Sequence, residues 1–173
     1  MKNIKHSDNV LSADNQQERL KHINPWYIVG FTEGEGTFHV AFYKDPQMKQ
    51  GIKVIPEFHI NQSYLRLEIL ETIKKYFDCG YLKQNHVKNK KDDTYVFVVR
   101  NRDDLIDKII PFFEKYNFIS DKQKSFTIFK QIVFLMQSGA HSNRAGIKKI
   151  INLAYKMNVN GKYRKTKKQD LYL

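Results

Sequence analysis

The alternation of apolar and polar residues becomes regular from Asn24 onward and predicts a helix that runs directly into a strand. Asn24 is a favourable N-cap, and Pro25 suits the first helical position because its missing N–H is not needed there. Beyond the helix, Phe38, Val40 and Phe42 alternate with more polar side chains. Alternation of this kind is typical of a strand with one buried face.

A second alternating run follows a polar hairpin over residues 45–51 and places Ile52, Val54 and Phe58 on one face. The two runs together predict an antiparallel pair of strands. Pro56 interrupts the second run, and its lack of an N–H indicates an edge position or a bulge.

The segment from residue 64 to residue 77 has the apolar spacing of a helix, and Gly80 just beyond it is a candidate cap. The predicted apolar face of this helix consists of Leu65, Ile69, Ile73 and Phe77.

A second hairpin is predicted next, with strands near residues 81–87 and 94–100 joined by a charged turn. Tyr95, Phe97 and Val99 form the apolar face of its second strand. Three helices complete the chain, at about residues 103–110, 122–137 and 143–156. We expect the first of them to end near Pro111, because proline fits poorly in a helix interior.

The order helix, two strands, helix, two strands, helices predicts an α+β fold, with an antiparallel sheet and its helices packed on one face. A length of 173 residues suits one compact domain. Residues 1–23 are polar and lack periodicity, so we interpret them as an N-terminal arm. The domain is expected over residues 24–160, followed by a basic tail over residues 161–173.

The charge of the chain favours a polyanionic partner. Lys and Arg number 30 against 18 Asp and Glu, which gives a net charge of +12. Basic groups that meet phosphates release condensed counterions, so such an excess favours nucleic acid. A merely solvated basic surface is the alternative.

Cys79 is the only cysteine, which excludes an internal disulfide and a zinc site built from cysteine pairs. No apolar run reaches the length of a membrane span, and the polar start lacks the apolar core of a signal peptide. We therefore expect a soluble, unsecreted protein with no membrane partner. Its Lys- and Asn-rich composition suggests an AT-rich organellar genome, of a mitochondrion or chloroplast.

The stretch from Ile28 to Gly36 carries the candidate chemistry. Gly30 and Gly34 lie four residues apart, a spacing that lets two helix backbones approach closely. The same helix brings Glu33 and Glu35 to its C-terminal end, where carboxylates are unfavourable without a cation. A divalent metal would supply that cation. An exposed acidic turn capped by glycine is the alternative interpretation.

This stretch resembles the signature of the LAGLIDADG homing endonucleases, in which such a helix ends in acid-Gly-acid-Gly and runs into a strand that enters DNA. The order of elements over about residues 24–137 is similar to that family too. The resemblance implies a saddle of antiparallel strands in the DNA major groove, with two signature helices forming the interface between its halves.

The resemblance also implies roles for individual residues. Glu35 matches the metal-binding acid, although Glu stands where Asp is frequent, and the carbonyl of Gly34 matches a further ligand. Gln62 resembles a residue that orders water near the cleaved bond. Lys122 resembles the basic residue near the scissile phosphate, with Lys124 as the fallback. The implied cofactor is Mg²⁺, for which Mn²⁺ can substitute, whereas Ca²⁺ binds without supporting cleavage.

A double-strand cut needs two acidic sites, and this chain has one signature. We therefore expect a twofold homodimer that recognises a pseudo-palindromic target. The predicted dimer interface consists of Ile28, Gly30, Phe31 and Gly34.

Base reading is expected from the polar face of the sheet, because alternate side chains of a ribbon in the major groove point at base edges. The candidate readers are His39, Tyr43, Lys53, Glu57, His59, Lys83, Asn85 and Arg100. The candidate phosphate contacts are Lys156, Lys162, Arg164 and Lys165.

Together these features predict a site-specific homing endonuclease. It would make a staggered double-strand cut in a long pseudo-palindromic DNA target by metal-dependent phosphodiester hydrolysis. Two alternatives remain open: a maturase that binds its host intron RNA, and a non-catalytic DNA-binding protein on the same scaffold. A plain structural or protein-interaction domain explains neither the charge nor the acidic glycine cluster.

Overall fold

The computed structural model describes residues 23–86 and 92–157. The interpretations of residues 1–22 and 161–173, with Lys162, Arg164 and Lys165, lie outside the described residues. The elements that position the site are α2 (Pro25–Glu35), β1 (Gly36–Lys44), β2 (Ile52–Ser63), α3 (Leu67–Phe77), β3 (Tyr81–Gln84), β4 (Thr94–Val99), α6 (Lys122–Gln137) and α7 (Arg144–Met157).

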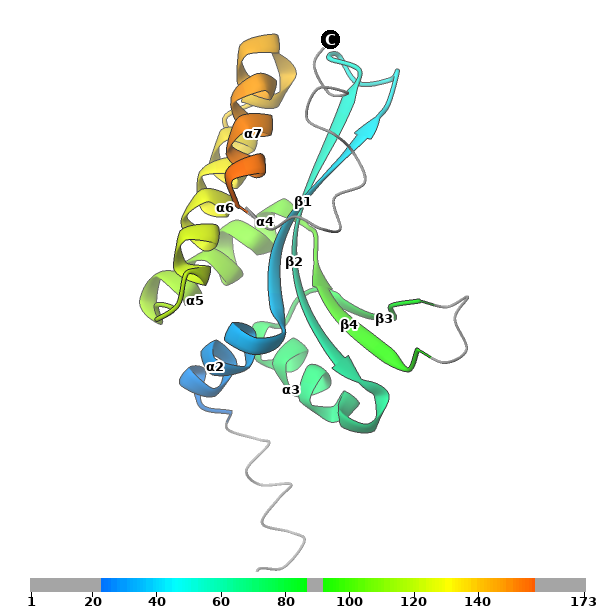
Figure 1. The fold of residues 1–173 in the computed structure, drawn as a ribbon, viewed down its shortest axis with the longest axis vertical. Helices are drawn as coiled ribbons and strands as arrows, with labels where there is room; N and C mark the ends of the chain where they lie inside the picture. The colour runs from blue at the N-terminus through cyan, green and yellow to red at the C-terminus, as the bar shows by residue number, and fades with distance from the viewer. Residues whose placement is uncertain (1–22, 87–91, 158–173) are drawn as a thin grey trace, which may run out of the picture.

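The four strands form one antiparallel sheet in the order β1-β2-β4-β3, which confirms the predicted α+β fold. β1 pairs with β2 along its whole length, from Gly36 opposite Ile60 to Lys44 opposite Ile52. β4 pairs only with the second half of β2, from Phe58 to Ser63. The β1–β2 pair therefore extends beyond the other strands as a two-stranded arm (Figure 1).

Pro56 shows how the sequence pattern and this arrangement agree. β2 is an interior strand in the sheet order, yet Pro56 lies in the arm, where it faces Val40 of β1 and lacks a recorded partner in β4. The edge position is therefore confirmed locally, because one side of β2 is unpaired at this residue. The register of β1 and β2 is continuous, so the proline is not in a bulge.

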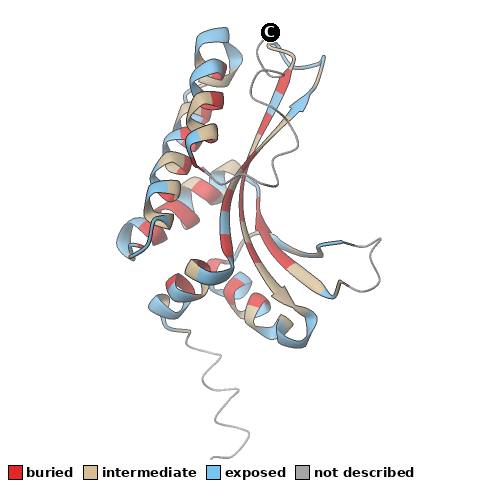
Figure 2. Cartoon of the chain, viewed as in Figure 1, coloured by how far each residue is buried: buried red, intermediate tan, exposed pale blue. Residues whose placement is uncertain are grey.

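One face of the sheet packs on the helices and forms a single core. In Figure 1, α6 and α7 lie side by side along β1 and β2, with α2 and α3 at the other end of these strands. Phe38 of β1 is 2% exposed and its ring lies 5.1 Å from that of Phe129 in α6. Burying a phenylalanine of this kind contributes about 1.5–3 kcal/mol. Buried residues therefore concentrate where strands face helices (Figure 2).

The junction of α2 and β1 is set by local chemistry. The side chain of Asn24 accepts a hydrogen bond from the Trp26 N–H at 2.9 Å, which confirms the predicted N-cap. At the other end Gly36 turns the chain into extended backbone immediately after the last helical residue. A Cβ at Gly36 would approach Cγ2 of Thr32 to 2.4 Å, so only glycine fits without a shift. The chain thus leaves the helix and enters the sheet within one residue.

The expectation that a helix ends near Pro111 is wrong. An α-helical turn, α4 (Arg102–Asp104), continues through a π-helical segment, η2 (Leu105–Ile109), into α5 (Ile110–Lys115). In the π segment the Ile110 N–H bonds to the Leu105 carbonyl, which shifts the hydrogen-bond register just before the proline. Pro111 then falls in the first turn of α5, where its missing N–H costs little.

The predicted helix over residues 64–77 also differs in detail. Its first turn is a separate 3-10 helix, η1 (Tyr64–Arg66), and Leu65 is 83% exposed rather than on the apolar face. Leu70 takes that place in the core. Asp78, with φ of 48°, rather than Gly80 forms the left-handed cap of α3.

Candidate functional site

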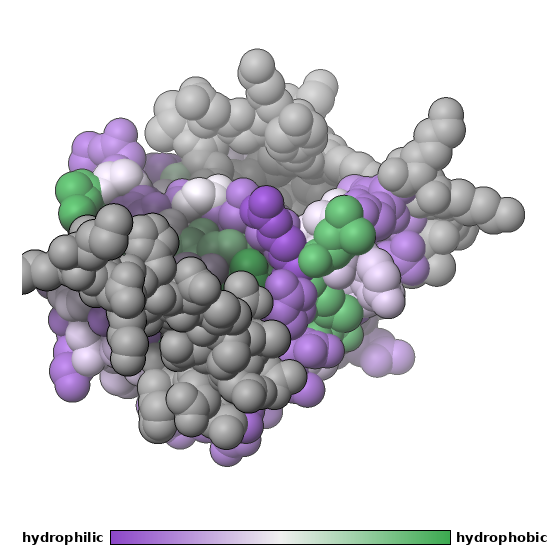
Figure 3. Space-filling model, turned by 90° about the horizontal axis from the view of Figure 1, so that it is seen from below, coloured by the Kyte–Doolittle hydropathy of each residue, from purple (hydrophilic) through white to green (hydrophobic). Residues whose placement is uncertain are grey.

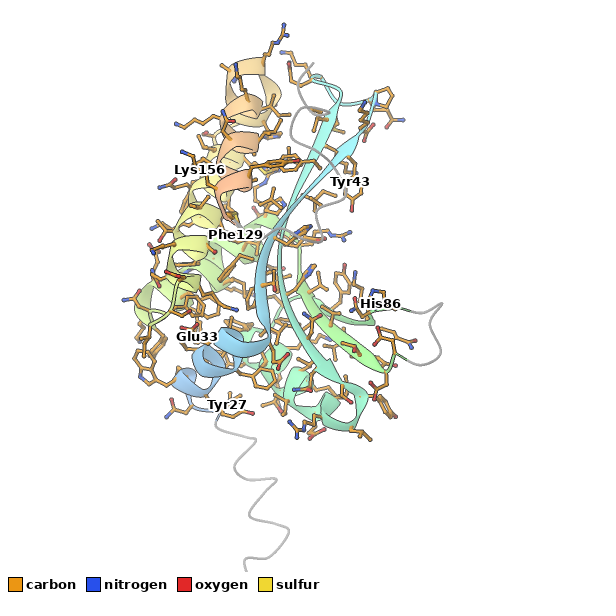
Figure 4. The ribbon with its side chains drawn as sticks, in the orientation of Figure 1. Tyr27, Glu33, Tyr43, His86, Phe129 and Lys156 are labelled. Atoms are coloured by element: carbon orange, nitrogen blue, oxygen red, sulfur yellow. The ribbon has the colours of Figure 1, made fainter. Side chains whose placement is uncertain are left out.

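The two acids at the end of α2 have different surroundings. Glu33 accepts hydrogen bonds from the backbone N–H groups of Ile119 and Ser120, at 2.9 and 3.1 Å, and from the Ser120 hydroxyl. Burial opposes its ionisation, but these hydrogen bonds and the charge of Lys122 outweigh that effect and lower the pKa of Glu33. Figure 4 shows Glu33 on the side of α2 that faces α5 and α6. Glu33 therefore ties the end of α2 to the segment that starts α6.

Lys122 lies at the same junction. Its ammonium group donates to the backbone carbonyls of Thr32, at 2.7 Å, and of Gly36. Burial lowers the pKa of Lys122, while the charges of Glu33 and Glu35 oppose that shift. A cation at this point offsets the negative end of the helix dipole. Lys122 thus holds the backbone on both sides of Glu35.

Lys124, the fallback position, is exposed and forms a surface ion pair with Asp121 at 2.7 Å. The pair joins residues three apart at the start of α6. Surface ion pairs of this kind contribute about 0–1 kcal/mol to the stability of the fold. The geometry therefore favours Lys122 as the basic residue of the junction.

Glu35 presents its carboxylate to solvent. It is exposed, and among the described residues no hydrogen bond or ion pair of its carboxylate is recorded. Gly34 beside it is exposed as well. A carboxylate and a backbone carbonyl are hard oxygen ligands of the kind that Mg²⁺ prefers, so these residues fit a divalent ion.

One chain supplies too few ligands for such an ion. Within residues 23–86 and 92–157, no group of three or more His, Cys, Asp or Glu side chains could hold a metal. Mg²⁺ needs about six oxygen ligands, many of which are commonly water and phosphate oxygens. Glu35 and Gly34 can therefore form only part of a metal site, which a phosphodiester, water or a second copy of the chain would complete.

Gln62 lies near the end of β2 that meets this junction. The register places Ile60 of β2 opposite Gly36, the first residue of β1. Gln62 is two residues further along β2, beyond the point where its pairing with β1 ends. The Gln62 side chain is half-buried, and its carbonyl oxygen accepts the Ser63 N–H at 2.8 Å. This bond orients the amide group but leaves its NH₂ able to donate.

The predicted base-reading residues fall on the face of the sheet that the helices leave open. Tyr43, Lys53, Lys83, Asn85 and Arg100 are exposed. His39 and His59 are partly exposed on β1 and β2, with their rings 6.1 Å apart. The sequence pattern therefore assigned these seven side chains to a surface that a ligand can reach.

Glu57 is the exception among the predicted readers, because it is only 5% exposed. Its carboxylate is paired with Nε of Arg100 and lies 3.1 Å from Nε2 of His59. Burial opposes its ionisation, but these two partners lower the pKa of Glu57 to about 2. Direct contact of Glu57 with a base does not fit this burial, since both carboxylate oxygens already have partners.

The predicted dimer face needs one correction. Ile28 is 0% exposed and belongs to the core of its own chain, so it is not available to a second copy. Gly30 and Gly34 are exposed, and a Cβ at either would meet nothing within 4 Å. Phe31 stacks on Tyr27, which is 47% exposed.

Tyr27 was missing from the predicted interface. It precedes Gly30, Phe31 and Gly34 by three, four and seven residues, which is the spacing of one helix face. This helical period was the signal that could have found it. Figure 3 views the end of the molecule that carries α2 and α3, where separate hydrophobic patches lie in a mostly hydrophilic surface.

Membrane insertion gains no support from the helices of the described residues, because none of them is both long enough and apolar enough to cross a bilayer.

Comparison with known proteins places this geometry in a family. The family model described as LAGLIDADG endonuclease matches residues 28–133. A relative from Neurospora crassa, named probable intron-encoded endonuclease 2, is 36% identical over 148 residues, which cover 85% of this chain and 31% of the relative. The chain thus spans about a third of the length of that curated relative.

Solved structures give the same result. The archaeal intron-encoded homing endonuclease I-Vdi141I, solved in complex with DNA, is 31% identical with a TM-score of 0.76, over 86% of this chain and 91% of that one. I-SmaMI, solved on an uncleaved DNA target in the presence of calcium ions, is 30% identical with a TM-score of 0.75, over 80% of this chain and 46% of that one. The residues that the family model matches include α2 from Ile28 onward, the whole sheet and most of α6, and so contain both Glu35 and Lys122. The chain therefore belongs to the LAGLIDADG endonuclease family.

Proposed function

We propose that this chain is a site-specific homing endonuclease, which makes a staggered double-strand cut in a long pseudo-palindromic DNA target by metal-dependent phosphodiester hydrolysis. One observation carries the proposal: Glu35 is exposed at the α2–β1 junction, directly beside the half-buried ammonium group of Lys122. An open carboxylate next to a fixed cation suits a metal ion and a phosphate at the same point.

The metal ligands of each protomer are the Glu35 carboxylate and the Gly34 carbonyl. The chemistry that Mg²⁺ would supply there is activation of a water molecule and neutralisation of phosphate charge. Mn²⁺ is expected to substitute for it, and Ca²⁺ is expected to bind without supporting cleavage. I-SmaMI, with its calcium ions and uncleaved target, supports the choice of a divalent ion.

Three further side chains act around the reacting phosphate. Lys122 stabilises negative charge that develops there, and its bonds to Thr32 and Gly36 keep the helix end in place. Gln62 orders water through its amide group, which Ser63 orients. Glu33 is a positioning residue, because it acts by fixing the end of α2 against the segment before α6.

Two copies of the chain are needed for a double-strand cut. The exposed face of Tyr27, Gly30, Phe31 and Gly34 is the surface through which they would meet, since the glycines let two helices approach closely. A twofold dimer uses this face in both copies and brings both Glu35 carboxylates near its axis.

Target recognition is assigned to the open face of the sheet. Its exposed Tyr43, Lys53, Lys83, Asn85 and Arg100 would enter the major groove of each half-site, with His39 and His59 between them. Lys156 on α7 points away from the sheet (Figure 4), so it is a weaker candidate for a phosphate contact than the sequence suggested. The intron-encoded relative supports an origin in an intron, and an organellar genome stays the prediction made from composition.

Substitution of Glu35 tests the proposal. Glu35→Gln removes a metal ligand without adding bulk, and we expect cleavage of a selected target in Mg²⁺ to fall by at least about 1000-fold. DNA binding in Ca²⁺ should stay within about tenfold, because phosphate contacts dominate affinity. Glu71→Gln, an exposed acid on α3, is the matched control and should cleave normally. Cleavage by Glu35→Gln at the normal rate would overturn the assignment of the site.

A further inference from the structure

A buried ionic group lies in the middle of the open face of the sheet. Glu57 lies in β2, and Arg100 is the residue just after β4. The register that pairs Phe58 with Val99 places Glu57 and Arg100 directly opposite each other. They share the face that the helices do not cover, because Phe58 and Val99 point into the core. The carboxylate of Glu57 accepts from Nε of Arg100.

The two partners of this pair differ in exposure, and that difference indicates a role. The side chain of Glu57 is 7% exposed, whereas that of Arg100 is 46% exposed. A buried carboxylate is costly unless it is paired and hydrogen-bonded. The Nε–H of the exposed Arg100 guanidinium supplies that bond and charge to Glu57. The bond to Glu57 uses Nε, so the two terminal nitrogens of this half-exposed side chain are not needed for it.

The neighbours of the pair restrict it further. Nε2 of His59, whose side chain is 20% exposed, lies 3.1 Å from the second carboxylate oxygen of Glu57. Tyr43 and Tyr81, both exposed, are close enough to Arg100 for their charge to affect its pKa. Val98, two residues before Arg100 and on the same face of the sheet, is 0% exposed. The contact that orients Arg100 is therefore its bond to Glu57, on a face where Tyr43 and Tyr81 lie near enough to influence its charge.

We infer that Glu57 is a positioning residue that fixes Arg100 so that its terminal N–H groups read a guanine at one base pair of each DNA half-site. The two-donor fork of arginine matches the O6 and N7 acceptors of guanine in the major groove. An arginine held in one orientation loses less conformational freedom on binding than a free one, which favours selectivity for that base. This inference rests on the proposed function, because it requires that the open face meets DNA.

The two members of the pair differ in what they can still offer a ligand. Glu57 is almost fully covered, with Arg100 and His59 beside its two oxygens, whereas Arg100 is about half exposed and uses only its Nε–H for Glu57. The arrangement therefore separates two roles that the sequence pattern merged: Arg100 contacts DNA and Glu57 orients it.

The test is the base preference of the full-length protein at every position of its target. Wild type and Glu57→Gln are each used to select and cleave DNA from a library randomised around the wild-type target. We expect Glu57→Gln to lose preference for guanine at one position, and at its symmetry mate, by about tenfold. Preference at the other positions should be unchanged.

Four further variants make the result specific. Arg100→Gln should lose preference at the same position, and the double variant should lose no more than Arg100→Gln alone, because Glu57 acts through Arg100. Glu57→Asp keeps the charge and should restore part of the preference. Lys53→Gln, on the same strand and face but exposed, is the matched control and should alter a different position or none.

The outcomes separate this inference from the proposed function. A wild-type protein that selects no target would overturn the proposed function, and the inference with it. A wild-type protein that selects a target, with an unchanged profile for folded Glu57→Gln, would overturn the inference alone. If Glu57→Gln fails to fold, Arg100→Lys decides, since it retains a cation for Glu57 but removes the fork; an unaltered base profile for Arg100→Lys would contradict the inference.

Discussion

The α2–α6 junction and the Glu57–Arg100 pair leave opposite charges exposed. At the junction Glu33 and Lys122 are engaged with the backbone, and the carboxylate of Glu35 is left exposed. In the sheet the carboxylate of Glu57 is engaged, and Arg100 is left exposed. If the proposed function holds, the partner that the fold buries decides which charge is offered to DNA: an acid for a metal ion, or a guanidinium for a base edge.

This difference implies that cleavage and target choice are separable. Changes at the junction should reduce the rate of cleavage and leave the preferred target unaltered. Changes at the Glu57–Arg100 pair should do the reverse. The predictions below test this separation in order of decreasing effect.

The largest effect is expected from Gly30→Leu, which adds bulk where two α2 helices would meet. The change meets nothing within its own chain, so the protomer should fold normally. Overpacking costs about 1–3 kcal/mol in each copy, so the dissociation constant of the dimer should rise by about 30-fold or more. Light scattering should then report a single chain mass, and double-strand cleavage should be lost.

Glu71→Leu adds the same side chain on α3, away from that face, and should remain dimeric and active. A Gly30→Leu protein that stays dimeric and cleaves normally would show that the copies meet elsewhere.

Lys122→Met should reduce cleavage by about 100-fold to 1000-fold, because it removes a cation beside the phosphate. It also leaves two carbonyls without their donor, so stability should fall by about 1–3 kcal/mol. Lys124→Met is the matched control, and its melting temperature and cleavage rate should barely change. A shift in the base profile of Lys122→Met would break the separation of the two regions.

Glu33→Gln should have a smaller effect, with cleavage reduced by about tenfold or less. The neutral amide can still accept from Ile119 and Ser120, but bonds to a charged acceptor are stronger by about 1 kcal/mol. Denaturant titration measures the loss of stability, and single-turnover kinetics measures the rate. Complete loss of cleavage in a folded Glu33→Gln protein would instead indicate that Glu33 contacts the metal.

The smallest effect concerns the pH dependence of stability. Glu57 has a folded-state pKa of about 2, below its ordinary value of 4.5. Its ion pairs therefore stabilise the fold above pH 4.5, and this contribution is lost as the pH falls through about 2. The difference in unfolding free energy between wild type and Glu57→Gln should shrink over that range. A difference that is constant from neutral to acidic pH would contradict the ionised pair.

Local patterns were sufficient to predict the elements that carry the site. The N-cap at Asn24 and the change of period after Gly36 depend on neighbouring residues alone, and both are found in the structure. The helix that follows Pro111 was missed because a π-helical segment accommodates the proline, and nothing in the residue types there indicates one.

The burial of individual side chains was harder to predict, because it depends on distant segments. Alternation placed Glu57 on the open face correctly, but its burial requires Arg100, which lies 43 residues away in sequence. Likewise, Ile28 was assigned to the outside of α2 although the core of its own chain covers it. The apolar run from Val96 to Val99 did offer a signal that side chains on the open face are buried around β4. A continuous apolar run, in place of alternation, is typical of a strand buried on both faces.

The most direct test of the account is a mixture of wild-type and Glu35→Gln chains, refolded together so that protomers exchange. A double-strand break needs both Glu35 carboxylates, whether each strand is cut by one copy or both copies contribute to each cut. Only dimers with two intact acids therefore make a double-strand break. Double-strand cleavage should then fall as the square of the wild-type fraction, to about a quarter for an equal mixture. A fall in direct proportion to that fraction, to about a half, would contradict the paired acidic sites.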